Sequence, residues 1–154
     1  MDIQLVRASM EDAESIWRMQ RIAFASLLEK YQDFDTNPGN EPLEKVQWRF
    51  SFPATYFYFI RVDGVNVGAI RIIDHHDDSP KRISPLFVLP EYRGQGVAQS
   101  AIREAERIHG SEYWTLGTIL QESGNCHLYE KMGYRQTGDT KVINDHLTLV
   151  FYQK

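Results

Sequence analysis

The chain has 154 residues, of which 42% are hydrophobic and 25% are charged, and its formal net charge is −4 at pH 7. This length and composition suit one globular domain, residues 1–154. The slight acidity argues against a nucleic-acid surface, which needs a basic face, and no apolar run approaches the ~20 residues that cross a bilayer. The single cysteine, Cys126, allows no disulfide within the chain. Together with a start that lacks a signal peptide's features, it predicts a cytoplasmic protein.

The N-terminal third predicts a strand followed by two helices. Residues 3–7 have the composition of a strand, and Ser9 begins a capping-box pattern of the kind that precedes a helix. Apolar side chains then recur at helical spacing through residues 13–28. Residues 33–41 hold Asn-Pro-Gly-Asn and are expected to form a loop, and a shorter helix is expected at residues 42–50.

Three antiparallel strands are predicted next. Residues 55–62 are rich in aromatic and β-branched side chains, and Asp63-Gly64 is a strong hairpin signal before a partner strand at residues 65–73. A polar turn leads into a further strand at residues 82–89. Pro85 lies within that strand, and because proline cannot donate a ladder hydrogen bond, it predicts a β-bulge there.

The glycine-rich stretch at residues 90–98 predicts an anion site. It joins an apolar strand to an amphipathic helix, and the free N–H groups at a helix start attract negative charge. Gly94 and Gly96 permit positive φ and close approach of a ligand, and the Arg93 guanidinium suits phosphate. A P-loop is excluded because no Gly-Lys-Ser or Gly-Lys-Thr occurs, and the third glycine of a dinucleotide fingerprint is missing. The stretch therefore predicts a bound diphosphate.

The remaining elements alternate between helix and strand. A helix at residues 97–108 places its apolar side chains on one face, and a strand follows at residues 113–118. A strand, a crossover helix and a strand imply a parallel pair, the only one we expect. A short helix at residues 125–132 and two strands at 134–142 and 146–152 complete the chain.

Two motifs resemble the GNAT superfamily of acyl-CoA-dependent N-acetyltransferases. Arg-x-x-Gly-x-Ala at residues 93–98, preceded by Phe-Val-Leu-Pro-Glu-Tyr, resembles that family's pyrophosphate loop. Asn-Cys-His-Leu-Tyr-Glu-Lys-Met-Gly-Tyr at residues 125–134 resembles its second signature, and the order of elements over the whole chain is also similar. The resemblance implies an α/β (α+β) fold. Its central sheet is expected to be mixed and mostly antiparallel, with about six to seven strands, about four helices, and a bulged, splayed fourth and fifth strand pair.

The resemblance also implies an acetyl-CoA-dependent N-acetyltransferase. We expect an acetyl group to pass to a primary amine of a small molecule or peptide by direct attack in a ternary complex, with CoA as product. No nucleic acid, membrane or metal is expected as a partner, and a homodimer is compatible with such a fold. Three alternatives stay open: an acyltransferase that uses a longer acyl-CoA or a non-amine acceptor, a CoA-binding sensor or interaction domain without turnover, and a nucleotide-phosphate enzyme.

Site residues follow from the same resemblance. Tyr129 is expected to protonate the departing thiolate, and the Val88 N–H to polarise the thioester carbonyl as an oxyanion donor. The bulge is expected to expose backbone groups that pair with the pantetheine arm. The residues expected to bind the cofactor are Leu86, Phe87, Val88, Arg93, Gly94, Gln95, Gly96, Val97, Ala98 and Asn125.

The sequence does not identify the general base that deprotonates the amine. The candidates lie in the polar turn before the fourth strand and near the second helix: Asp74, His75, His76, Asp77, Asp78, Glu41 and Glu44. Adjacent histidines in a polar turn are more often solvated than bound to a metal. Specificity for the acceptor is expected from residues 31–42 and 139–146.

Overall fold

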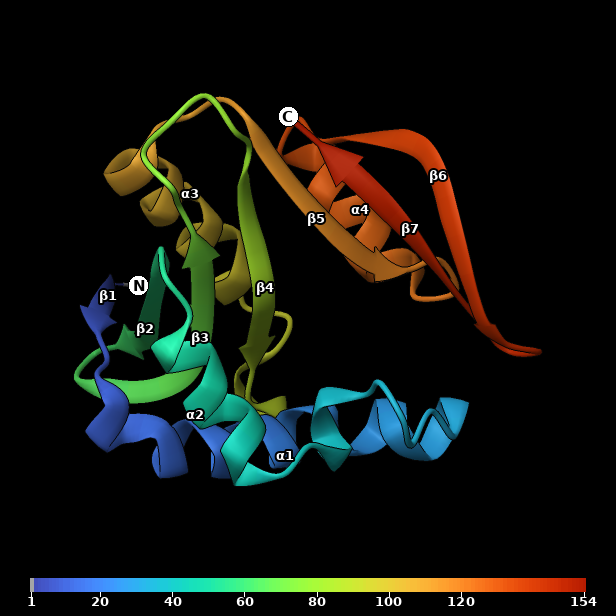
Figure 1. The fold of residues 1–154 in the computed structure, drawn as a ribbon, viewed down its shortest axis with the longest axis horizontal. Helices are drawn as coiled ribbons and strands as arrows, with labels where there is room; N and C mark the ends of the chain where they lie inside the picture. Colours follow the sequence, from blue (N-terminus) through green and yellow to red (C-terminus); the bar gives the residue numbers. More distant parts are fainter. Residues whose placement is uncertain (1) are drawn as a thin grey trace.

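One seven-stranded mixed sheet, in the order β1-β2-β3-β4-β5-β7-β6, runs through the computed structural model, which describes residues 2–154 (Figure 1). Its strands are β1 Ile3–Arg7, β2 Thr55–Val62, β3 Val65–Ile73, β4 Lys81–Val88, β5 Trp114–Ile119, β6 Arg135–Asn144 and β7 Leu147–Gln153. The helices are α1 Ala13–Tyr31, α2 Leu43–Ser51, α3 Val97–His109 and α4 Ser123–Lys131, with 3-10 turns at Met10–Asp12, Pro38–Asn40 and Pro90–Tyr92.

The predicted element order and fold class are confirmed, and only some boundaries differ. The capping box is present, since the Asp12 carboxylate accepts the Ser9 N–H at 2.9 Å. The first helix continues past residue 28 to Tyr31, where Gln32 takes a left-handed conformation with φ 55° and ends it. The short helix of the second motif begins earlier than predicted, at Ser123.

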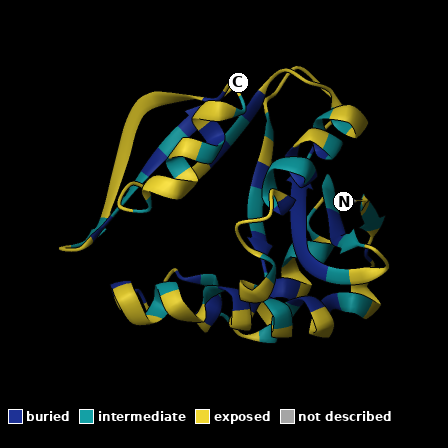
Figure 2. Cartoon of the chain, turned by 180° about the vertical axis from the view of Figure 1, so that it is seen from behind, coloured by how far each residue is buried: buried dark blue, intermediate teal, exposed yellow. Residues whose placement is uncertain are grey.

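The helices cover the two faces of the sheet and create two separate cores. On one face α1 and α2 pack against the central strands around Ile16, Val46 and Phe57. On the other face α3 buries Ala101 and Ile102, and the core there continues into the strands and helix of the C-terminal half. Figure 2 shows the central strands buried and β6 largely exposed at the edge of the sheet.

The sheet opens between β4 and β5, as predicted for the fourth and fifth strands. These parallel strands pair only at Lys81 with Trp114 and at Arg82 with Thr115. Beyond these two pairs they diverge, so that β5, β7 and β6 form a wing set at an angle to β1–β4 (Figure 1). Beyond these two pairs, the backbone N–H and C=O groups on the facing edges of β4 and β5 therefore do not pair with each other.

A β-bulge lies in β4 at the predicted place. Ile70 pairs with Leu86 and Ile72 pairs with Ile83, so Ser84 and Pro85 both lie opposite Arg71. The buried Arg71 guanidinium donates to the Ser84 carbonyl at 3.1 Å and so satisfies a carbonyl that the bulge displaces from the ladder.

The C-terminal turn of α1 reaches across the open end of the sheet (Figure 1). The Tyr31 hydroxyl donates to the Glu122 carboxylate at 2.5 Å, and the Lys30 ammonium does so at 2.7 Å. The Asn144 side chain donates to the Tyr31 carbonyl at 3.0 Å. We call these contacts the α1 clasp, because they tie the N-terminal half to the C-terminal wing.

Within residues 2–154, none of the helices combines the length and apolar character that crossing a bilayer requires.

Candidate active site

A cavity of about 520 Å³ lies between α1, β4, the start of α3 and α4, and we call it the loop cavity. It brings together most of the residues that were expected from the sequence to act in catalysis or bind the cofactor. Gln95 is the exception, because its side chain turns back and donates to the Glu91 carbonyl at 3.3 Å. The predicted residues that line the cavity are Leu86, Phe87, Val88, Arg93, Gly94, Gly96, Val97, Ala98, Asn125 and Tyr129.

The loop before α3 presents backbone N–H groups to this cavity. Gly94 and Gly96 have φ values of 75° and 79°, a conformation that other residues adopt only with strain, and open space lies where their Cβ atoms would be. Within the described residues, the N–H groups from Gly94 to Gly96 have no backbone partner, and those of Val97 and Ala98 belong to the free first turn of α3. That turn contains no acidic side chain, so nothing offsets the helix dipole. The loop therefore fits a diphosphate.

Arg93 has a structural role in addition to supplying a positive charge. Its guanidinium donates to the Val88 carbonyl at 3.1 Å and to the Ala23 carbonyl of α1. These two bonds fix the loop to both β4 and α1. Since a guanidinium carries five N–H donors, others remain for an anion in the loop cavity.

The backbone of β4 offers hydrogen-bonding groups on its open edge. Leu89 N–H donates to the Val67 carbonyl at 2.8 Å, which places this residue's polar groups on the β3 side. Because antiparallel pairing alternates along a strand, the Val88 N–H faces the opposite side, where β5 has diverged. The Phe87 and Val88 side chains are buried while this edge of the backbone stays free. An extended ligand in the gap can pair with it.

A second cavity, of about 340 Å³, lies between the strands of the splayed pair, and we call it the sheet cavity. Its walls come from the loop after α1, from β4 and β5, and from β6 and β7. The two cavities share five lining residues: Phe24, Leu27, Leu86, Asn125 and Tyr129. We call this shared set the throat. Ligands in the two cavities would meet there.

Tyr129 is the polar group with the clearest chemical role in the throat. Its ring packs against Tyr134 and Tyr152, with centroids at 6.1 and 5.9 Å. Its hydroxyl has no hydrogen-bond partner among the described residues. Burial, with a smaller contribution from Cys126, raises the pKa of Tyr129 to about 12. The phenol is therefore protonated at any physiological pH. Asn125 lies one turn earlier on α4, and its side chain is also without a partner in the described chain.

The base candidates from the sequence lie mostly elsewhere. Of the seven, only Glu41 lines either cavity, and its carboxylate is held by Arg49 at 2.5 and 2.6 Å and by Gln20 at 3.0 Å. Asp74 is buried on the α3 side of the sheet, where His109 Nδ1 lies 2.8 Å from its carboxylate. The remaining candidates, none of which lines a cavity, are Glu44, His75, His76, Asp77 and Asp78.

Four charged residues of the sheet cavity were not among the base candidates from the sequence: Asp33, Arg49, Arg82 and Lys141. Asp33 is 7% exposed and accepts hydrogen bonds from the Thr36 N–H at 3.1 Å and from the Thr36 hydroxyl. Arg82 lines the same cavity from β4. The Asp-x-x-Thr spacing is a local signal for Asp33, and it falls within the loop where specificity was expected. Arg82 has no local signal, because its place depends on the splay of β4 from β5.

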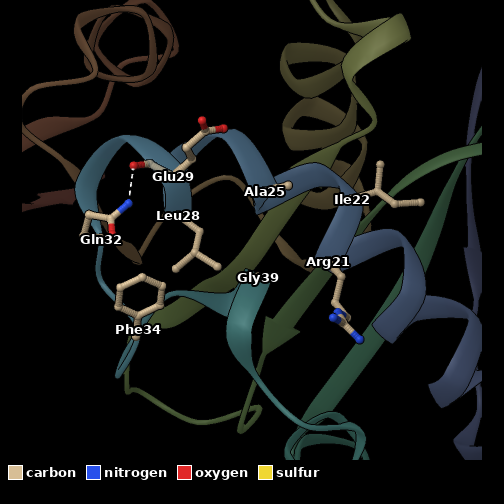
Figure 3. Close-up of a pocket in the computed structure, with 8 residues that line it drawn as sticks. All are labelled: Arg21, Ile22, Ala25, Leu28, Glu29, Gln32, Phe34 and Gly39. Atoms are coloured by element: carbon tan, nitrogen blue, oxygen red, sulfur yellow. Dashed lines mark hydrogen bonds between the residues drawn. The ribbon is translucent and has the colours of Figure 1, made fainter.

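A third cavity, of about 460 Å³, is unrelated to these two. It is a shallow hollow on the outer face of α1, where Leu28 and Phe34 face each other and the Gln32 side chain donates to the Glu29 carbonyl (Figure 3). None of the catalytic, cofactor-binding or base candidates lines it, although Gln32, Phe34 and Gly39 belong to residues 31–42, where specificity was expected.

Comparison with known proteins supports the fold described above. A sequence model described as the acetyltransferase (GNAT) family matches residues 21–134. N-acetylaspartate synthetase of Rattus norvegicus is 27% identical over 106 residues, which are 67% of this chain and 34% of that protein. The chain thus matches about a third of the length of that curated relative.

Solved structures show the same fold. An acetyltransferase from Thermus thermophilus superposes with a TM-score of 0.73 at 15% identity, covering 99% of this chain and 96% of that one. The PaiA N-acetyltransferase from Thermoplasma acidophilum, solved in complex with coenzyme A, has a TM-score of 0.67 at 18% identity and covers the whole of both chains.

Proposed function

Because the chain belongs to the acetyltransferase (GNAT) family, we propose that it is an acetyl-CoA-dependent N-acetyltransferase acting on a primary amine of a small molecule or peptide. One observation carries this proposal: the loop cavity and the sheet cavity meet at a throat that contains Tyr129 and Leu86. A diphosphate-bearing thioester in the loop cavity and an amine in the sheet cavity would place their reacting atoms together. Such positioning removes much of the entropic cost of a two-substrate reaction.

The loop cavity is proposed to hold the acetyl-CoA. The amides from Gly94 to Ala98 bind the pyrophosphate, and the open edge of β4 pairs with the pantetheine arm. Asn125 contacts the cofactor from α4. Support for this assignment comes from the free amides, the positive φ values and the absence of an acidic residue in the first turn of α3.

In the proposed reaction the amine nitrogen attacks the thioester carbonyl carbon, a C–N bond forms and the C–S bond breaks. The Val88 N–H donates to the carbonyl oxygen as negative charge develops on it. Tyr129 donates to the departing sulfur. A phenol of pKa about 12 is a weaker acid than a thiol of pKa ~8.5, by roughly 5 kcal/mol. Tyr129 therefore acts mainly by holding the thiolate with a hydrogen bond, and solvent completes the proton transfer.

The amine must lose a proton to attack. Glu41 is engaged by Arg49, whereas the Asp33 carboxylate is bound only by Thr36 among the described residues. We assign Asp33 as the carboxylate that holds the incoming ammonium and passes its proton to water.

The test is thiol release from acetyl-CoA with a panel of amines, followed by mass analysis of the products. Transfer is expected for at least one amine, with one acetyl group added per thiol released. Tight CoA binding without thiol release for any amine would favour the alternative, a CoA-binding sensor or interaction domain. Thermal shifts with ATP and NAD serve as controls, because a ligand at ~100 times its Kd stabilises by ~2.7 kcal/mol. Stabilisation by these nucleotides rather than CoA would contradict the cofactor assignment.

A further inference from the structure

The charges on the walls of the sheet cavity are unbalanced. Five charged side chains line it, and they are Asp33, Glu41, Arg49, Arg82 and Lys141. Two of them cancel, since Arg49 and Glu41 form a bidentate pair with only 12% and 13% of their side chains exposed. Arg82 and Lys141, in contrast, make no ion pair and no side-chain hydrogen bond with any other described residue. The cavity thus has two cations that its own carboxylates do not engage.

A further cation, Arg71 of β3, is buried next to β4. Arg71 is 4% exposed, and its guanidinium donates to the Thr55 hydroxyl at 3.1 and 3.3 Å and to the Ser84 carbonyl. All of these partners are neutral. Burial lowers the pKa of Arg71 to about 10, and the nearby charges of Arg49 and Arg82 act in the same direction. Three guanidinium groups therefore gather beside the bulge, and Glu41 is the one carboxylate paired with them in the described chain.

This arrangement selects between acceptor types. A simple amine enters as a cation and gains nothing from Arg82 or Lys141, and a polyamine is repelled by both. A carboxylate on the acceptor relieves the excess charge, and the planar guanidinium of Arg82 matches a carboxylate with two parallel hydrogen bonds. Arg82 and Lys141 are both solvent-exposed, so the selection depends on the paired hydrogen bonds and the excess positive charge and not on burial of the contact.

We infer that the acceptor carries a carboxylate in addition to its amine, that Arg82 of β4 binds this carboxylate, and that Lys141 of β6 adds positive charge to the same cavity. The inference rests on the proposed function, because it assigns the sheet cavity to the acceptor. It names Arg82 and Lys141 as residues that set specificity and leaves the chemistry at the throat unchanged.

The first test compares matched acceptors that differ only in the charged group. Suitable pairs are L-aspartate with L-asparagine, L-glutamate with L-glutamine, and L-phenylalanine with 2-phenylethylamine. For at least one pair, kcat/KM is expected to be at least about 10-fold higher for the member with the extra carboxylate, as befits a hydrogen bond to a charged group. Equal use of both members in every pair would overturn the inference.

The second test asks whether Arg82 and Lys141 cause the preference. In Arg82→Gln the ratio of kcat/KM within the preferred pair is expected to fall about 10-fold or more, toward 1. Lys141→Gln should lower it less, since Lys141 lines the cavity from β6 and contributes positive charge without the planar pair of donors that Arg82 offers. Arg82→Lys should restore part of the ratio. Arg103→Gln, which removes an exposed charge from α3, is the matched control and should leave the ratio intact. A ratio that survives Arg82→Gln would refute the assignment.

A binding measurement separates this inference from the reaction itself. With CoA present, two pairs of acetylated products are titrated into the wild-type protein and Arg82→Gln by calorimetry: N-acetyl-L-glutamate with N-acetyl-L-glutamine, and N-acetyl-L-phenylalanine with N-acetyl-2-phenylethylamine. Tighter binding of the member with the extra carboxylate in either pair, lost in the variant, supports the carboxylate site, even if no amine releases thiol. Thiol release with no difference within either pair would keep the proposed function and reject the carboxylate site.

Discussion

The loop cavity and the sheet cavity lie on either side of one throat, yet they are built in different ways. The loop cavity depends on backbone: free amides before α3, two glycines at positive φ and the open edge of β4. The sheet cavity depends on side chains contributed by the loop after α1 and by β4, β5, β6 and β7. A backbone site needs few particular residues, and a side-chain site can be altered one residue at a time.

This difference suggests a division of labour. The backbone site suits a ligand that stays the same, because changing it means changing the conformation of the chain. The side-chain site suits a ligand that differs from one related protein to the next, because single substitutions alter its charge and shape. Because the throat belongs to both cavities, substitutions there should change the rate of the reaction more than the affinity for either substrate.

The largest effect is expected at the throat itself. Tyr129→Phe removes the hydroxyl and keeps the ring, so kcat should fall about 10- to 100-fold while affinity for acetyl-CoA changes less than about 2-fold. Steady-state thiol release and calorimetry measure the two quantities. Tyr134→Phe is the control, because it loses the buried hydrogen bond to Glu106 at 3.0 Å and should cost stability but not turnover. Unchanged kcat in Tyr129→Phe would remove Tyr129 from the mechanism.

A smaller effect, confined to one cavity, is expected from Gly96→Ala. The left-handed conformation costs a residue with a Cβ about 1–2 kcal/mol, so the free loop of the variant should relax out of it. Because CoA binding must then restore this conformation, CoA should bind about 10-fold more weakly while the KM of the acceptor is retained. Gly138→Ala imposes comparable strain at φ 96° in β6, away from both cavities, and should leave CoA binding intact. If both variants weakened CoA binding equally, the loop would not be the site of the diphosphate.

The smallest effect concerns the α1 clasp, which borders the loop cavity through Glu122. Tyr31→Phe removes one hydrogen bond to Glu122 and should lower stability by about 1 kcal/mol, measured as a shift in Tm. Burial alone would raise the pKa of Glu122, but the hydrogen bonds from Lys30 and Tyr31 outweigh it and lower that pKa. The stabilising contribution of these hydrogen bonds is therefore fully present above pH 4.5, the ordinary pKa of a glutamate side chain. It is lost as the pH falls through the lower pKa that Glu122 has in the folded state.

The difference in Tm between wild type and Tyr31→Phe should consequently shrink as the pH is lowered below that range. Glu14→Gln provides a reference, because it breaks an exposed pair with Arg18 and should change Tm very little at any pH. A penalty for Tyr31→Phe that is constant from neutral to acid pH would show that Glu122 is not its partner.

The loop cavity could be predicted from the sequence because its signals are local. Gly94, Gly96 and the helix that follows them lie within a few residues of one another, and Pro85 marks the bulge without reference to the rest of the chain. The spacing of Asn125 and Tyr129 is likewise a property of one helix. Local patterns of this kind determine which backbone groups remain unpaired.

The sheet cavity could not be predicted in the same way. Arg82 and Lys141 line the same cavity only because β4 and β5 part after two residue pairs and because β6 returns beside β7. The buried Arg49–Glu41 pair, which disqualifies Glu41 as a base, joins a helix to the loop before it. The α1 clasp similarly joins the end of the first helix to residues near the end of the chain. These contacts depend on tertiary placement and leave no local pattern.

The separation of β4 from β5 has a consequence for self-association of the protein through its strand edges. Unpaired strand edges are templates onto which a second chain can add, and proteins usually blunt or cover them. Here the unpaired edge of β4 faces inward beneath α1 and α4, where only a slender extended molecule can reach it. At one outer edge of the sheet, β6 is blunted by register shifts on both sides of Lys141 and by Gly138 at positive φ. The molecule can therefore keep a strand edge unpaired for a ligand without offering it to another protein chain.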